Sequence, residues 1–208
     1  KKRIGYGVVD KVKDKNALIY RANLEGSIVI AKLINGKLRT DKLNNFYCQL
    51  ELINKRVPTP IIPLEKDTSK LTNSHWLAGF SDADGSFQVK TIKREGRKFG
   101  YEIRLNFQLD QKNKFILEQI KEVLGGSIGH RKSQDTFYYS SVNFGSAKKV
   151  INYFDHFNLL SSKHINFIKW RKVYRLIQSE EHLTKNGIEK ILKIKSSMNS
   201  LSKDSFEL

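Results

Sequence analysis

Trp76-Leu-Ala-Gly-Phe-Ser-Asp-Ala-Asp-Gly85 is the stretch that decides the fold of this 208-residue chain. Its spacing predicts a helix that begins near the N-cap candidate Ser74 and stops at Gly85. Trp76 and Phe80 are expected to face a core, while another stripe carries almost no side chain and would let a second helix approach closely. The interface stripe consists of Ala78, Gly79 and Ala83.

Two acids lie in the last turns of this predicted helix. Asp84 occupies the end at which the helix macrodipole disfavours negative charge, by roughly 0.3–1 kcal/mol, so it needs a compensating cation. A divalent metal would supply that charge. Asp82 points about 200° away around the helix, so the two carboxylates cannot bind one ion from the same face. We therefore expect Asp82 to brace backbone near the helix junction.

Leu77–Gly85 reads LAGFSDADG and resembles the nine-residue signature of the LAGLIDADG homing endonucleases and their maturase relatives. Residues 105–112, 144–148 and 160–163 are similar to the phrases that follow this motif in proteins encoded within mitochondrial group I introns, so the resemblance covers essentially the whole chain. It implies an α+β fold in which each half has the order αββαββα with an antiparallel sheet. It also implies a mitochondrial location.

The resemblance implies a catalytic site as well. In the family the penultimate acid of the signature binds the metal, which gives that role to Asp84. A lysine before the last long helix and a glutamine on the sheet support the site, and Lys163 and Gln111 match those positions. Lys42 is the counterpart of Lys163 in the internal repeat described below. The five scattered histidines show no metal-ligand spacing, and oxygen ligands favour Mg²⁺.

The proline distribution predicts two pieces joined by a linker. All three prolines lie between Val57 and Leu71 and are followed by a polar run, a composition typical of a linker. We assign residues 1–56 to a smaller piece, 57–73 to the linker and 74–208 to a larger piece.

The two pieces are related by a weak repeat. Gly5–Asp14 resembles Gly126–Asp135, and Lys42–Phe46 resembles Lys163–Phe167, which gives a period of about 120 residues. The larger piece is then one complete half. The smaller is the C-terminal part of the preceding half, whose own signature helix would lie before Lys1. We expect that helix to come from a missing N-terminal segment or a second chain.

Alternating residues predict strands with one polar face. Apolar residues alternate with polar ones from Ser86 to Lys90 and from Tyr101 to Asp110, as in half-buried strands. Helices are expected at about 112–124, 146–157 and 187–201, with a long one after Lys163. Arg, Lys, Asn and Gln are the side chains that read base edges in a major groove. The predicted nucleic-acid face comprises Ser86, Gln88, Lys90, Arg104, Asn106, Gln108, Arg131 and Lys132; the turn 93–98 is expected to meet phosphates.

The composition indicates a folded protein with a polyanionic partner. The chain has 38 Lys and Arg residues against 21 Asp and Glu, a net charge of +17 and a pI near 9.9, a balance that favours nucleic-acid binding. The single cysteine, Cys48, excludes an intramolecular disulfide. No apolar run approaches the roughly 20 residues that span a bilayer, so a membrane partner is not expected.

Two functions follow from the sequence. The first is a site-specific DNA endonuclease that hydrolyses phosphodiester bonds of double-stranded DNA with Mg²⁺ and makes double-strand breaks. This fragment alone would lack half of the site, because the family uses one acid from each of two signature helices. The second is a non-cleaving, RNA-binding maturase or RNA scaffold that assists group I intron splicing by holding structured intron RNA. The intact Asp84 favours the enzyme without deciding between them.

Overall fold

The structure is a computed structural model that describes residues 2–15, 17–96, 99–141 and 143–198. It divides into two compact units, unit 1 (Lys1–Ser69) and unit 2 (Lys70–Leu208). We describe each unit by itself. No helix among the described residues combines the length and the apolar character needed to cross a membrane.

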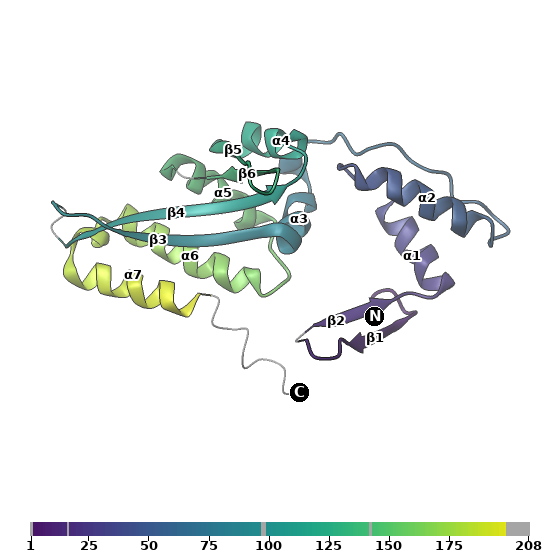
Figure 1. Cartoon of the computed structure of the whole chain (residues 1–208), viewed down its shortest axis with the longest axis horizontal. Helices are drawn as coiled ribbons and strands as arrows, with labels where there is room; N and C mark the ends of the chain where they lie inside the picture. The colour runs from purple at the N-terminus through teal and green to yellow at the C-terminus, as the bar shows by residue number, and fades with distance from the viewer. Residues whose placement is uncertain (1, 16, 97–98, 142, 199–208) are drawn as a thin grey trace. The chain divides into compact units, whose positions relative to one another are not determined.

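Unit 2 is built on an antiparallel sheet of four strands in the order β3-β4-β6-β5 (Figure 1). The strands are β3 (Gly85–Lys93), β4 (Tyr101–Gln111), β5 (Ser127–Arg131) and β6 (Thr136–Ser140). In the β3–β4 pair, Gln88 lies opposite Asn106 and Lys90 opposite Arg104. This register puts the predicted polar residues of both strands on one face, because side chains alternate along a strand.

Helices precede, interrupt and follow the sheet. They are α3 (Trp76–Asp84), α4 (Phe115–Leu124), α5 (Phe144–His156), α6 (Lys163–Gln178) and α7 (Lys185–Ser197), with short 3₁₀ turns η1 (Leu71–Asn73) and η2 (Glu181–Leu183). The order from α3 to α5 is αββαββα and the further helices α6 and α7 follow it, which confirms the predicted α+β fold with an antiparallel sheet. The last helix was expected to reach Leu201; it ends at Ser197, and Leu201 lies outside the described residues.

The core of unit 2 lies between the sheet and the helices α5 and α6, which cover one of its faces (Figure 1). Phe87 of β3 packs against Phe107 of β4 and against Phe154, Phe167 and Trp170 of the two helices. All of these rings are buried. The apolar face of the alternating strands is thus fully covered, and the polar face is left for other contacts.

Unit 1 contains a two-stranded antiparallel sheet and two helices: β1 (Val8–Lys11), β2 (Leu18–Arg21), α1 (Leu24–Ile34) and α2 (Lys42–Asn54). Its buried hydrophobic core consists of Ala31, Phe46 and Leu50. The proline-rich segment after α2 runs along these helices, because the side chains of Asn35 and Asn54 hydrogen-bond its backbone at Ile61, Ile62 and Leu64. Most of the predicted linker is therefore part of unit 1.

The elements β1-β2-α1-α2 repeat the local structure of β5-β6-α5-α6. Gly7 and Gly126 both have left-handed backbones, with φ of 85° and 89°. Each glycine faces the ring of the tyrosine thirteen residues later, Tyr20 or Tyr139. A Cβ on either glycine would lie 2.4 Å from the backbone carbonyl oxygen of the residue after that tyrosine. This geometry pairs Gly7, rather than the Gly5 of the sequence comparison, with Gly126.

The helices that follow the two hairpins start in the same way. Asn23 accepts a hydrogen bond from the backbone N–H of Gly26, and Asn143 accepts one from the N–H of Ser146. Such an N-cap satisfies one of the free amides of the first helical turn. The two copies therefore share their turn glycine, their strand register and their helix cap.

Candidate nuclease centre and nucleic-acid face

The carboxylate of Asp84 lies exposed at the C-terminus of α3, beside the end of β4. It is brought there because β3 begins directly after α3 and Gly85 pairs with Leu109. The Nε2 of Gln111, the last residue of β4, donates a hydrogen bond of 2.7 Å to the Oδ2 of Asp84. Two of the predicted catalytic residues are thus in contact, and the bond leaves Oδ1 of the carboxylate available to a cation.

Lys163 approaches the same helix end from the first residue of α6. Its Nζ donates to the backbone carbonyls of Ala83 at 2.7 Å and Ser81 at 3.3 Å. Burial lowers the pKa of this ammonium group, while the charges of Asp84 and Asp82 oppose the shift. Lys163 therefore binds the carbonyls at the end of α3, where the macrodipole favours a cation, while its charge also acts on the nearby Asp84.

Asp82 has a bracing role, as expected from its direction on the helix. Its carboxylate accepts hydrogen bonds from the backbone N–H groups of Leu160 and Ser161, at 2.8 and 3.1 Å, and from the Ser161 hydroxyl. Partial burial opposes ionisation, but these hydrogen bonds keep the pKa of Asp82 below its ordinary value. The prediction is confirmed: Asp82 ties α3 to the segment that leads into α6 and thereby helps to place Lys163.

The small-residue stripe of α3 is only partly open. Ala78 is 2% exposed within the core of unit 2, and its backbone N–H donates to the hydroxyl of Tyr153. The assignment of Ala78 to an open helix interface is therefore wrong, because the chain's own α5 occupies that side. Gly79 and Ala83 are exposed, and a Cβ built on Gly79 would meet nothing within 4 Å. These two residues leave room for a close neighbour.

The polar face of the sheet carries a connected set of side-chain hydrogen bonds. Asn106 donates to the side chains of Gln88 and Gln108 and accepts a bond of 2.5 Å from Ser140. Gln88 in turn donates to Ser86. Asn106 is only 3% exposed, so it holds its neighbours in place from beneath, and a contact from Asn106 to a base would first have to break this network.

The charged residues of the face stand farther from Asp84. Lys90 and Arg104 face each other across β3 and β4 and are exposed; at about 3.3 Å per residue they lie roughly 20 Å along the strands from Asp84. Lys132 is also exposed. The face therefore extends from the acid over a length that matches several nucleotides, since one strand of B-DNA advances about 3.4 Å per nucleotide.

Acidic residues orient the arginines of this face. Glu102 accepts from Arg104 at 2.5 Å and from Arg94 at 3.0 Å, and these bonds, Arg104 first, hold the pKa of Glu102 below its ordinary value. Asp110 pairs with Arg131 at 2.8 Å. Neither acid was among the residues predicted for this face, although strand alternation places both on it. Arg97 and Lys98 of the adjacent basic turn lie outside the described residues.

The remaining predicted catalytic residue, Lys42, belongs to unit 1. It is the first residue of α2, as Lys163 is the first residue of α6. Lys42 is exposed there. Its place in the repeat thus matches that of Lys163. Among the described residues of unit 1, however, there is no acid-bearing helix end that Lys42 could contact.

The acids of the described residues do not form a closed metal cage, since no group of three or more His, Cys, Asp or Glu side chains lies together there. Mg²⁺ rarely uses such cages and is commonly bound by one or two carboxylates together with water and substrate phosphates. The exposed Asp84, with an amide donor on one oxygen, fits this open kind of site.

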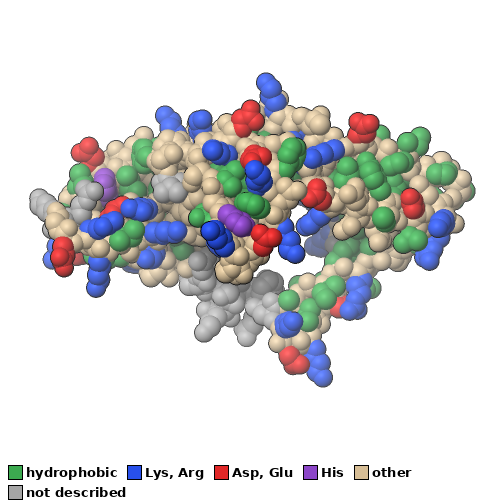
Figure 2. All heavy atoms as spheres, turned by 45° about the horizontal axis from the view of Figure 1, so that its top comes forward, with side chains coloured by type: hydrophobic (Ala, Val, Ile, Leu, Met, Phe, Trp, Pro, Cys, Tyr) green, Lys and Arg blue, Asp and Glu red, His purple; other side chains and the backbone are tan. Residues whose placement is uncertain are grey.

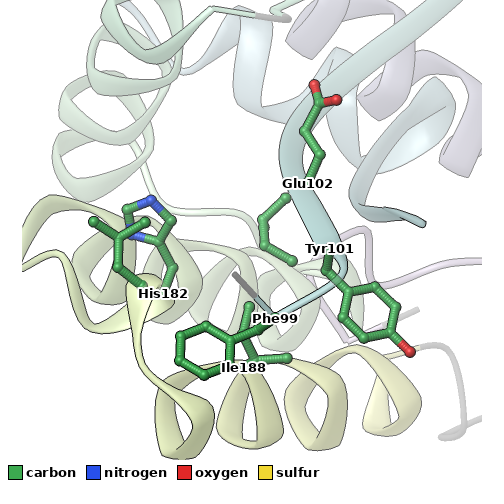
Figure 3. A pocket seen from close by; sticks show the side chains of 7 residues that line it. Phe99, Tyr101, Glu102, His182 and Ile188 are labelled. Carbon is green, nitrogen blue, oxygen red and sulfur yellow. The ribbon is translucent and has the colours of Figure 1, made fainter. Parts of the chain in front are cut away.

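A cavity of about 400 Å³ lies at the opposite end of β4, away from Asp84. It is lined by Phe99, Tyr101, Glu102, Ile103, His182, Leu183 and Ile188 (Figure 3). Its wall is mostly aromatic and aliphatic and comes from the β3–β4 end and from η2 and α7. The cavity thus lies between the end of the β3–β4 pair and the elements η2 and α7, away from the candidate nuclease centre. Figure 2 shows Lys and Arg side chains scattered over the visible face, with Asp and Glu side chains between them.

Comparison with known proteins gives the site its context. Residues 77–174 match the model of the family described as LAGLIDADG endonuclease. The chain is 50% identical, over 201 residues, to the uncharacterized cox1 intron-2 37.2 kDa protein of Schizosaccharomyces pombe. That match covers 93% of this chain and 60% of the relative. The chain spans 37% to 60% of the length of this and two further intron-encoded relatives.

Two solved structures are similar in fold. The archaeal intron-encoded homing endonuclease I-Vdi141I, solved in complex with DNA, is 31% identical with a TM-score of 0.55, over 58% of this chain and 78% of that one. The meganuclease I-AabMI, solved with uncleaved DNA, matches with a TM-score of 0.75 at 23% identity, over 95% of this chain and 83% of that one. The second likeness supports the fold alone.

Proposed function

We propose, because this chain belongs to the LAGLIDADG endonuclease family, that it forms the DNA-binding and metal-binding part of a site-specific DNA endonuclease. The polar face of unit 2 would lie in a major groove of double-stranded DNA. Asp84 would hold Mg²⁺ beside a scissile phosphate at the end of that face. A mitochondrial location belongs to the same proposal, because relatives are named for cox1 and ND4 introns.

The observation that carries the proposal is the contact between Asp84 and Gln111. It joins an exposed acid at a helix end to the strand that also carries Arg104. A helix C-terminus is an unfavourable place for an acid, and among the described residues no backbone N–H donates to Asp84 as those of Leu160 and Ser161 donate to Asp82. The position of Asp84 therefore suits the binding of a cation better than a role in stabilising the fold.

Each side chain of the site then has a defined part in phosphodiester hydrolysis. Bound Mg²⁺ would lower the pKa of water and stabilise the developing charge on the phosphate. Gln111 fixes the direction of the Asp84 carboxylate through its 2.7 Å hydrogen bond. The ammonium group of Lys163, held on the carbonyls of α3, stabilises negative charge that develops nearby. Double-strand breaks would require a second acid, supplied by another signature helix.

The alternative is a non-cleaving maturase that binds structured intron RNA with the same charged surface. A net charge of +17 favours the binding of DNA and of RNA equally. The strand pair with exposed Arg and Lys favours DNA, because the wide major groove of B-DNA admits a β-ribbon whereas that of A-form RNA is too deep and narrow for side chains to read.

A selection experiment tests the proposal. The chain is used to select DNA from a library with randomised sequence, and the affinity for the selected DNA is measured at several salt concentrations. Each phosphate contact should contribute about −0.9 to the slope of log K against log salt. Arg104→Ala should weaken binding to the selected DNA about tenfold, which corresponds to the roughly 1–3 kcal/mol of a good base contact.

The matched control is Arg175→Ala, because Arg175 is an exposed arginine on α6, away from the polar face. It should change the affinity by less than about twofold. Equal losses in the two arginine variants would remove the sheet face as the DNA-binding surface. Tighter binding to structured RNA than to any selected duplex would favour the maturase instead.

A further inference from the structure

The side chains on the polar face of unit 2 form a chain of hydrogen bonds that runs from β3 along β4. The Nε2 of Gln88 donates to the hydroxyl of Ser86 at 3.0 Å. The Nδ2 of Asn106 donates to the Oε1 atoms of Gln88 and Gln108, at 3.3 Å each. The Nε2 of Gln108 in turn donates to the Oδ2 of Asp110 at 2.9 Å. Each amide of this chain therefore has one definite orientation of its oxygen and its nitrogen.

One member of the chain determines that orientation. Amide and hydroxyl groups both donate and accept, so Asn, Gln and Ser side chains alone would allow the hydrogen bonds to run in either direction. An ionised carboxylate only accepts, and Asp110 forms an ion pair with Arg131 at 2.8 Å. Gln108 must therefore turn its nitrogen to Asp110 and its oxygen to Asn106. Asn106 is 3% exposed, so its amide has to find its partners within the protein, and it donates to both glutamines.

Gln88 is the amide through which this orientation reaches the surface of β3. It is partly exposed, whereas Asn106 and Gln108 are buried. After its bonds with Asn106 and Ser86, its amide keeps one oxygen lone pair and one N–H for a ligand. Gln offers such a pair to adenine in a major groove. An amide that is turned over exchanges the positions of its donor and its acceptor, and so changes the base edge that it matches.

We infer that Asp110 is a positioning residue for base recognition by Gln88. Its charge sets the direction of the hydrogen bonds through Gln108 and Asn106, and thereby the orientation of the Gln88 amide. Asp110 lies four residues (110 − 106) beyond Asn106, which is opposite Gln88. This separation is about 13 Å along the strands, or roughly four nucleotides of B-DNA, so the two side chains face different base pairs. The inference rests on the proposed function, because the polar face has to lie on DNA.

Asp110→Asn tests the inference, because it removes the charge and keeps the shape of the side chain. The position read by Gln88 is first identified as the one whose base preference disappears in Gln88→Ala. There the wild type should favour one base about tenfold, as expected of a good side-chain contact to a base. In Asp110→Asn the ratio should fall below about threefold, because both directions of the chain become possible. A change of folding or of net charge alone would shift the affinity for all sequences alike and leave this ratio unchanged.

The matched control is Glu102→Gln. Glu102 is an acid of the same face and also lies four residues (106 − 102) from Asn106, in the opposite direction along β4. Its hydrogen bonds go to Arg94 and Arg104, outside the chain that ends at Gln88. The base ratio at the Gln88 position should therefore stay within about twofold of the wild type. Equal losses of this ratio in the two acid variants would overturn the inference.

A second measurement follows the orientation of the Gln88 amide without DNA. The nuclear Overhauser effect between the Nε2 protons of Gln88 and the β-protons of Ser86 reports the 3.0 Å contact of the two side chains. It should fall at least about twofold in Asp110→Asn and stay unchanged in Glu102→Gln. Either an unchanged Overhauser effect or an unchanged base ratio in Asp110→Asn would overturn the inference. Failure of the proposed function is distinguishable, since the wild type would then select no duplex at all.

Discussion

Unit 1 and unit 2 contain the same run of two strands and two helices, but only unit 2 buries it. The turn glycine and the N-cap agree closely between Gly7 and Gly126 and between Asn23 and Asn143. Burial does not agree: unit 1 has three buried hydrophobic residues in its core, whereas unit 2 has a continuous core on one side of its sheet. Local sequence thus determines where the strands and helices form. In unit 2 the helix α3 and the hairpin β3–β4 provide the surface against which these elements are buried.

The second difference is chemical. A lysine is the first residue of α2 in unit 1 and of α6 in unit 2, namely Lys42 and Lys163. In unit 2 this lysine meets the end of the acid-bearing helix. Within unit 1 the described residues include no such helix end. The proposed metal site therefore belongs to unit 2, and five substitutions test how far the two units differ.

The largest effect is expected in the core. Phe154→Ala removes a fully buried ring that packs on four others, so it should lower the free energy of unfolding of unit 2 by about 3–5 kcal/mol. Ile34 lies eleven residues after the N-cap Asn23, as Phe154 lies eleven residues after Asn143, and it lines an open apolar groove between α1 and α2. Ile34→Ala should therefore cost less than about 1.5 kcal/mol. Both free energies are measured by urea unfolding, followed by the intrinsic fluorescence of the aromatic side chains and by far-UV circular dichroism. Similar losses in the two variants would mean that the groove of unit 1 is already filled.

A smaller effect is expected at the paired lysines. Lys163→Met removes the cation that donates to two carbonyls of α3 and should lower the free energy of unfolding by about 1 kcal/mol, because these hydrogen bonds are partly exposed. Lys42→Met should leave the stability of unit 1 unchanged within error, since the structure shows no such bonds for Lys42. Chemical denaturation of the two variants provides the measurement. A loss at Lys42 as large as that at Lys163 would contradict the difference between the units.

The smallest effect is a dependence on pH at Asp82. Its hydrogen bonds from Ser161 and Leu160 lower its pKa against the opposing effect of burial, so the ionised form stabilises the folded state. This stabilisation is present above the ordinary pKa of an aspartate, about 4, and is lost as the pH falls through the lowered value. Asp82→Asn should therefore reduce stability at pH 7 by less than about 1 kcal/mol, and the difference from the wild type should shrink as the pH falls below 4. A difference that is constant with pH would show that the charge of Asp82 is not involved.

Much of unit 2 could be predicted from the sequence because its signals are local. Alternation placed β3 and β4, and the helices expected to stop at Gly85 and at residue 124 end there in the structure, as α3 and α4. The direction of Asp82 followed from helical geometry alone. These features depend on neighbours within a few residues, which a sequence shows directly.

The failures concern contacts between distant residues. Ala78 was assigned to an interface, but the hydroxyl of Tyr153, 75 positions later, bonds its backbone N–H. Asn106 was expected to be open to bases, but Ser140 and two glutamines hold it. Gly5 was aligned with Gly126, but the backbone conformation and the tyrosine contact select Gly7. None of these could be read from periodicity, because each depends on packing between elements.

The central claim is that Asp84 holds a divalent cation next to bound DNA. Fe²⁺ has the charge of Mg²⁺ and accepts oxygen ligands, and with ascorbate and peroxide it releases hydroxyl radicals that cut nearby DNA. This measurement does not depend on a second acid, so it applies to the chain as it is. DNA that the chain has selected is end-labelled, and the positions of Fe²⁺-dependent scission are mapped for the wild type and for Asp84→Asn. The account predicts cuts confined to one short stretch, suppressed by excess Mg²⁺ and absent in Asp84→Asn, whose DNA affinity stays within about twofold of the wild type. Identical cutting by wild type and variant would contradict the claim.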